Sequence, residues 1–123
     1  MKRIDVGALL LGNLERVFNE RNRDARDRAL AEFWSDNPVM YEADEILMGS
    51  RAISDGVEKI HAKMPAEVRF RPVGRPVENH GTALLRWEAG VPGAPALVSG
   101  VDVAVILDDR IHTLHVYLER APS

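Results

Sequence analysis

The stretch GVDVAVILDDRIHTLHVYLE, residues 100–119, contains two apolar runs on either side of the polar triplet 108–110. Valine and isoleucine favour strands, and a short Asp-rich connection between two apolar runs is typical of a β-hairpin. The pattern therefore predicts antiparallel strands at 96–107 and 111–119. It also places one acid, Asp102, between two valines of a buried strand. Acidic residues are rarely buried without a partner, so Asp102 is the first candidate for a functional residue.

The period of two continues on the N-terminal side of this hairpin. Val68 and Phe70 alternate with arginines, which predicts a half-exposed strand, and a longer strand is expected at 77–89. The segment 90–95, GVPGAP, is rich in glycine and proline and predicts a loop between that strand and the hairpin.

The first half of the chain has the period of a helix. Residues 5–21 carry apolar side chains three and four apart, and Asp5 is expected to cap this helix by accepting from free amides of its first turn. After a polar link at 22–24, a second helix is expected to run toward Pro38, and a short strand to follow at 39–44. A third helix is expected from Gly49-Ser50 to Pro65.

Helices in the first half and strands joined by short loops in the second predict an α+β fold. We expect one domain, residues 1–123, with three N-terminal helices packed on one face of a strongly curved antiparallel β-sheet. No internal repeat or low-complexity segment interrupts the chain.

Composition excludes several classes of function. The net charge is -3, with 16 basic and 19 acidic residues, so the chain lacks the basic surface expected for binding nucleic acid or an anionic membrane. Cysteine is absent, which excludes disulfides and thiolate zinc sites. No run approaches the roughly 20 apolar residues of a membrane span, and the N-terminus lacks the cleavage site of a signal peptide. We therefore expect a cytoplasmic protein.

Three motifs, in their order and spacing, resemble those of a known superfamily. They are Phe33-Trp34 followed by PVMYE at 38–42, then GSRAI at 49–53, then GVDV at 100–103 with Arg110-Ile111. The sequence is similar to the nuclear transport factor 2-like superfamily, which includes SnoaL-like polyketide cyclases, ketosteroid isomerase, limonene-epoxide hydrolase and scytalone dehydratase. The resemblance implies a cone-shaped, cystatin-like fold (an α+β barrel) whose sheet bends around the first helix and whose hollow holds an apolar ligand. The superfamily contains enzymes and non-enzymes.

The resemblance also implies roles for two acids. Asp102 matches the strand carboxyl that ketosteroid isomerase keeps protonated to bind a developing oxyanion. An acid in an apolar cavity resists ionisation, so a neutral Asp102 can donate a hydrogen bond and an ionised one can act as a base. Glu42 falls where the isomerase carries its catalytic base, although Asp44 or Tyr41 is an alternative at that place. The other interpretations are an ion pair or backbone cap for Asp102 and a solvated acidic edge for residues 42–45.

One position departs from the isomerase. Where that enzyme supplies a tyrosine hydroxyl from its first helix, the register places Leu14, which has no polar atom. An oxyanion site here would lack one of two donors, a loss of about 3 kcal/mol of transition-state stabilisation in analogous sites.

The remaining site residues are predicted to line the hollow and contact the substrate, with ordinary core packing as the alternative. Trp87 offers a flat apolar wall with one N–H group. The predicted substrate-binding residues are Tyr41, Asp44, Trp34, Trp87, Leu85, Leu114, Val116 and Leu118.

His112 and His115 are not expected to bind a metal together, because residues three apart on a strand face opposite sides. We expect no cofactor. His115 and Tyr117 are predicted to lie on the outer face of the sheet, where a homodimer would form. Three hypotheses result: a cofactor-free acid–base enzyme acting on a small apolar ligand, a non-catalytic binding module, and a dimerisation domain whose hollow is filled by its own side chains.

Overall fold

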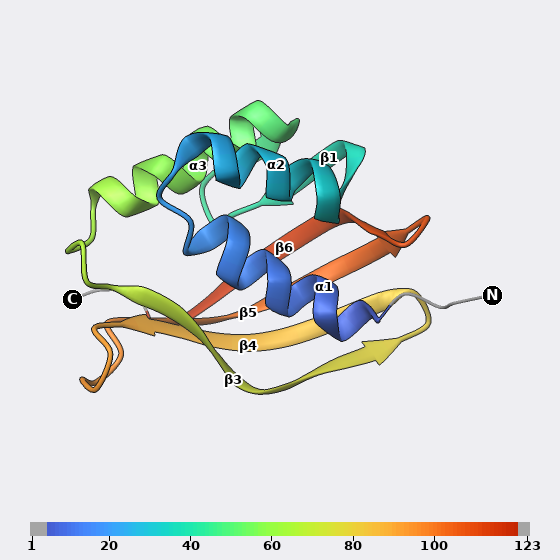
Figure 1. Ribbon diagram of the computed structural model, residues 1–123. Helices are drawn as coiled ribbons and strands as arrows, with labels where there is room; N and C mark the ends of the chain where they lie inside the picture. The colour runs from blue at the N-terminus through green and yellow to red at the C-terminus, as the bar shows by residue number, and fades with distance from the viewer. Residues whose placement is uncertain (1–4, 121–123) are drawn as a thin grey trace.

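The computed structural model describes residues 5–120, and its helices lie on one side of a single sheet (Figure 1). The helical elements are α1 (Val6–Asn13), the π-helical turn η1 (Leu14–Phe18), α2 (Arg23–Phe33) and α3 (Ser50–Ala62). The predicted cap is present, since the Asp5 side chain accepts from the amide of Ala8 at 3.3 Å. The predicted first helix is thus correct in place, but its second half winds as a π-helix.

The sheet has six strands in the order β2-β1-β6-β5-β4-β3. Their bounds are β1 (Trp34–Tyr41), β2 (Ile46–Met48), β3 (Arg69–Asn79), β4 (Thr82–Gly90), β5 (Val98–Leu107) and β6 (Arg110–Arg120). The α+β class and the helices on a curved sheet are confirmed. The sheet is mixed and not wholly antiparallel as expected, because β1 and β6 pair in parallel while the other neighbours are antiparallel. It also does not close into a barrel, since the edge strands β2 and β3 do not pair with each other. No described helix is long and apolar enough to cross a membrane.

Several boundaries differ from the sequence prediction. The strand expected at 39–44 ends at Tyr41, and β2 follows it as a strand that was not predicted. The second helix ends at Phe33, and Trp34 already has the extended angles φ -109° and ψ 156°. Trp34 pairs with Ile111 of β6, so tertiary pairing starts a strand where periodicity alone suggested helix. The predicted strand at 77–89 is divided by a turn at His80 and Gly81, both with positive φ, between β3 and β4.

The hairpin predicted within residues 96–119 forms as strands β5 and β6, and β5 carries Asp102. Asp108 and Asp109 adopt φ values of 51° and 62° between Leu107 and Arg110, which face each other across the turn. Two consecutive residues with positive φ are the mark of the type I′ turn, whose twist matches that of the flanking strands. The turn sets the pairing of Leu107 with Arg110 and of Ile106 with Ile111. A one-residue shift of register between Val105 and Ile106 then places Asp102 opposite Val116.

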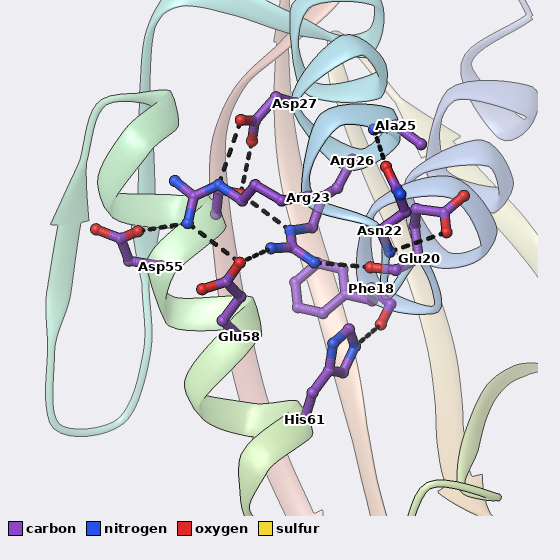
Figure 2. A network of polar contacts seen from close by, with 11 residues as sticks. Phe18, Glu20, Asn22, Arg23, Ala25, Arg26, Asp27, Asp55, Glu58 and His61 are labelled. Atoms are coloured by element: carbon purple, nitrogen blue, oxygen red, sulfur yellow. Dashed lines mark hydrogen bonds and ion pairs between the residues drawn. The ribbon is translucent and has the colours of Figure 1, made fainter.

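Arg26 of α2 is fully buried, with 0% of its side chain exposed, and joins α2 to α3 (Figure 2). Its guanidinium donates to the Ser54 hydroxyl at 2.9 Å, the Glu20 carbonyl at 2.8 Å and the Glu58 carboxylate at 2.7 Å. All three nitrogens of the guanidinium therefore have acceptors, which a buried charge requires. This network fixes α3, whose C-terminal turn forms one wall of the cavity described next.

Candidate functional site

A cavity of about 470 Å³ lies between the helices and the inner face of the sheet. Its walls are mainly apolar and come from η1, the end of α3 and four strands of the sheet. One acid, Asp102, lies among these apolar side chains, while the β1–β2 loop, Lys59 of α3 and Lys63 just after α3 contribute the charged part of the lining. The volume falls within the range of ligand pockets, and a few polar groups in an apolar cavity are the usual composition of such pockets.

Asp102 lies on β5, one of the two central strands, opposite Leu85 of β4 and Val116 of β6. Only 4% of the residue is exposed. Its Oδ1 accepts a hydrogen bond from the Trp87 indole N–H at 2.8 Å, and within residues 5–120 it forms no ion pair. Burial raises the pKa of Asp102 to about 7, against the opposing effect of the Trp87 hydrogen bond. The alternative interpretation was an ion pair with an arginine. Among the described residues Asp102 has the Trp87 indole as its partner instead.

Trp87 is held against Asp102 by close packing on two sides. Gly100 lies opposite it on β5, and a Cβ atom at position 100 would collide with the indole ring and with the Tyr117 carbonyl. On the other side the Phe70 ring lies 5.3 Å from the Trp87 ring, between centroids. A glycine at 100 thus lets the indole lie over the strand that carries Asp102.

Asn19 anchors the Phe70 side of this packing. Its side-chain amide accepts from the Phe70 N–H at 2.6 Å and donates to the Phe70 carbonyl at 2.7 Å. Because β3 is an edge strand, these backbone groups have no further strand to pair with, and Asn19 takes that place. Sequence reasoning did not name Asn19, Phe70 or Phe18 as site residues. Phe70 and Phe18 carried a signal, through the period-two strand at 68–71 and the apolar face of the first helix, whereas Asn19 carried none.

The second predicted acid, Glu42, lines the same cavity at the β1–β2 loop, together with Asp44. Burial, followed by the negative charges of Glu45 and Asp44, raises the pKa of Glu42, while Lys63 and Lys59 act in the opposite direction. The loop is closed by a hydrogen bond from the Glu42 amide to the Glu45 carbonyl at 2.9 Å. The cavity therefore has a second carboxyl group, that of Glu42, whose pKa is above its usual value.

Four predicted substrate-binding residues lie outside the cavity lining. Tyr41 is on the outer face, where its ring stacks on His115 at 4.6 Å, because alternation along β1 turns Met40 inward. Trp34 is buried and donates to the Asn13 side chain at 2.7 Å. Leu85 and Leu114 are fully buried in the core. By contrast, Trp87, Asp44, Val116 and Leu118 all line the cavity.

The first helix contributes Leu14 and Phe18 to the cavity, the first and last residues of the π-helical turn. Such turns occur often at functional sites, because the extra residue displaces side chains from their α-helical positions. Leu14 lines the cavity at the position that the sequence resemblance assigned to a tyrosine, and it supplies no hydrogen-bond donor. Within residues 5–120 no three His, Asp or Glu side chains are placed so that they could hold a metal ion together.

No protein-family model matches the sequence, and no curated protein matches it. Among solved structures, the chain is similar to a candidate isomerase of the SnoaL-like family from Agrobacterium tumefaciens, with 20% identity, a TM-score of 0.82, and 91% of this chain and 95% of that one covered. A candidate polyketide cyclase from Sinorhizobium meliloti has 18% identity and a TM-score of 0.68, with 88% and 92% covered. An NTF2-like protein of unknown function from Cytophaga hutchinsonii has 18% identity and a TM-score of 0.66, with 96% and 93% covered. At these identities the likeness is one of fold, and the chain has the SnoaL-like, NTF2-like fold that its motifs predicted.

Proposed function

We propose that this protein binds a small apolar ligand, such as a cyclic, polyketide-like or steroid-like molecule, in the cavity and catalyses cofactor-free acid–base chemistry on it. The reaction would be of the isomerase, cyclase or hydrolase type. The observation that carries the proposal is a buried acid at an apolar cavity, Asp102, whose pKa is raised to about 7 by burial. A group with a pKa near the working pH is present in both forms, as a proton donor or acceptor requires.

Trp87 determines how Asp102 would meet a ligand. The indole N–H is only a donor, so it occupies Oδ1 as an acceptor and leaves the proton of the neutral acid to Oδ2. A neutral Asp102 would then donate from Oδ2 to a carbonyl or developing oxyanion, and an ionised one would remove a proton there. Glu42 is the second proton-transfer group of the proposal, because it lines the same cavity and its pKa is also raised.

The chemistry is expected to differ from that of ketosteroid isomerase. Leu14 offers no donor to the oxyanion, and removing one donor from such a site costs about 3 kcal/mol of transition-state stabilisation. The second candidate function, a binding module without catalysis, uses the same cavity and the same apolar walls. The two differ only in whether a bound ligand exchanges protons with Asp102.

Proton exchange separates these two functions. In D₂O, with a panel of β,γ-unsaturated cyclic ketones, we expect the protein to accelerate deuterium incorporation next to the carbonyl, as measured by NMR. Asp102→Asn keeps the shape of the neutral acid but cannot transfer a proton, so the acceleration should fall by about 100-fold or more. Asp36→Asn is the matched control, since the Asp36 side chain is 98% exposed, and it should change nothing. Ligand binding without acceleration would support the binding module, and an active Asp102→Asn variant would show that another group moves the proton.

We also propose that the outer face of the sheet joins two copies of the chain. In Figure 1 no described element covers this face. One row of paired residues crosses all six strands there: Ile46, Tyr41, His115, Val103, Leu84 and Val77. Ile46 and Val77, at its two ends, are 63% and 60% exposed. We call these six residues the outer row, and five of the six side chains are hydrophobic or aromatic.

The size of this face is sufficient for a homodimer. Strands about 4.8 Å apart, rising about 3.4 Å per residue, give the five longer strands a face of roughly 24 by 30 Å, or about 700 Å². Stable interfaces bury about 600–1,000 Å² on each partner, a range that includes this area. A pair of charges of opposite sign, Arg86 and Glu119, joined at 2.8 Å, allows such a face to be complementary to its own copy.

Charges placed beside the outer row should separate the two copies. We expect the double variant His115→Glu, Tyr117→Glu to be monomeric by light scattering at concentrations where the wild type is dimeric, because association would bury four unpaired carboxylates. Arg28→Glu with Ala31→Glu, at two exposed positions of α2 on the other side of the sheet, is the control and should remain dimeric. A dimeric double variant would exclude this face as the interface.

A further inference from the structure

The centre of the outer row is a histidine. His115 lies on β6, the third of six strands, between Tyr41 of β1 and Val103 of β5. Its imidazole stacks on the Tyr41 ring at 4.6 Å and 10° and lies 6.5 Å from the Tyr117 ring at 19°. Any partner that covers the outer row from end to end also covers His115.

None of the hydrogen bonds or ion pairs within residues 5–120 involves the His115 ring. Around it on the same face lie the phenols of Tyr41 and Tyr117, the Thr113 hydroxyl on β6, and the valines of β5. This face also carries two ion pairs, each joined at 2.8 Å: Arg86 of β4 with Glu119 of β6, and Arg71 of β3 with Glu88 of β4. The acids of this face named here are thus already paired with arginines, and none of the described residues bonds to His115 as the counter-charge that a protonated imidazole would need once water is removed.

We propose that His115 makes association of the two copies dependent on pH, with the dimer stable when the imidazole is neutral and weakened when it is protonated. This inference rests on the proposed dimer. Histidine is the side chain whose charge changes between pH 5 and 8. Covering a neutral imidazole stacked between tyrosines costs little, whereas covering an imidazolium without a counter-charge is expensive.

Two-fold symmetry doubles the number of His115 protons that association must release. In a two-fold symmetric dimer both copies contribute the same patch, so two His115 side chains are buried together. If each has to lose a proton on association, the dissociation constant rises by up to about 100-fold for each unit of pH below the histidine titration range. Acidification does not work against the fold through Asp102, because an acid whose pKa is raised by burial makes the folded state more stable at low pH.

The experiment is to measure the dissociation constant by analytical ultracentrifugation at pH 8.0, 6.5 and 5.5, with circular dichroism as the check that the chain stays folded. We expect the wild type to dissociate at least 10-fold more readily at pH 5.5 than at pH 8.0. His115→Phe, which keeps an aromatic ring in the stack and cannot be charged, should remain equally dimeric at the three pH values. His112→Gln is the matched control: His112 lies on the same strand but bonds to Ser35 at 3.0 Å, and its replacement should preserve the pH dependence.

The outcomes separate this inference from the dimer on which it rests. A wild type that is monomeric at pH 8.0 at every concentration excludes the proposed dimer itself. A dimer whose dissociation constant does not change with pH, or a His115→Phe variant that dissociates in acid as the wild type does, excludes His115 as the group responsible. Loss of the pH dependence in His112→Gln would assign it to His112 instead.

Discussion

Asp102→Asn is expected to make the protein more stable above neutral pH and to remove a large part of its pH dependence. The pKa of Asp102 is raised from an ordinary value near 3.8 to about 7 by burial. Between these two values the folded state holds a proton that the unfolded state has released, so the free energy of unfolding falls as the pH rises. The contribution of the neutral acid is fully present below about pH 4 and lost above about pH 7, and roughly three units of pKa correspond to about 4 kcal/mol.

Urea denaturation of the wild type and of Asp102→Asn at pH 4, 6 and 8, at one protein concentration, measures this effect. Asparagine keeps the acceptor for Trp87 and does not titrate, so the difference in unfolding free energy between the two proteins should grow by up to about 4 kcal/mol from pH 4 to pH 8, in favour of the variant. Asp36→Asn, at a 98% exposed side chain, should leave the slope of the wild type unchanged. A difference that does not vary with pH would mean that Asp102 is ionised at ordinary pH in the folded protein.

The second large effect is expected at the Arg26 network of Figure 2. Glu58→Gln keeps an oxygen to accept from Arg26 but removes the carboxylate that lies 2.7 Å from a guanidinium with 0% exposure. Arginine cannot lose its proton, so the buried charge remains. Breaking a buried ion pair from one side costs 3–5 kcal/mol, and we expect about 3 kcal/mol because Glu58 itself is 48% exposed.

Asp55→Asn is the matched control for this prediction. Asp55 pairs at 2.7 Å with Arg23, whose side chain is 34% exposed, so the same loss of charge occurs one turn away in contact with water. Exposed pairs contribute about 1 kcal/mol or less. Chemical denaturation of both variants should therefore separate them clearly. Equal losses would mean that Asp27, whose carboxylate accepts from Ser54 at 2.7 Å, compensates Arg26 without Glu58.

Much of the fold and the centre of the site follow from periodicity. The alternation at 100–106 placed Asp102 on one face with Gly100 and Ala104. The resemblance to the superfamily then indicated that Asp102, Trp87 and Val116 line the cavity, and all three do. Periodicity does not predict element boundaries or strand register where contacts distant in the sequence determine them. The Trp34 side chain would face the core whether the residue belonged to a helix or to a strand. The apolar pattern therefore did not reveal that β1 begins at Trp34. Tyr41 belonged to a strand whose register the sequence left open, and the parallel pairing with β6 settled it.

The residues that sequence reasoning missed act through geometry that no local pattern encodes. Asn19 follows a π-helical turn and bonds to the backbone of Phe70, 51 positions along the chain. Nothing near Asn19 in the sequence signals this contact, since an asparagine after a helix is commonly a simple end of that helix. The pair Arg26 and Glu58 also has no local signal in the sequence, because Arg26 of α2 is buried only by its packing against α3.

The tight turn at Asp108 and Asp109 limits which insertions and deletions this hairpin can accept during evolution. Neighbouring residues on β5 and β6 face opposite sides: Asp102 and Val116 point to the cavity, while Val103 and His115 lie on the outer row. An insertion or deletion of one residue between Asp102 and the turn would exchange these sides, turning the acid out and a valine in, wherever a bulge such as the one between Val105 and Ile106 does not absorb it. Substitutions can tune either surface separately, but a change in length alters both at once. Related sequences that keep an acid here should therefore also keep the number of residues between it and the turn.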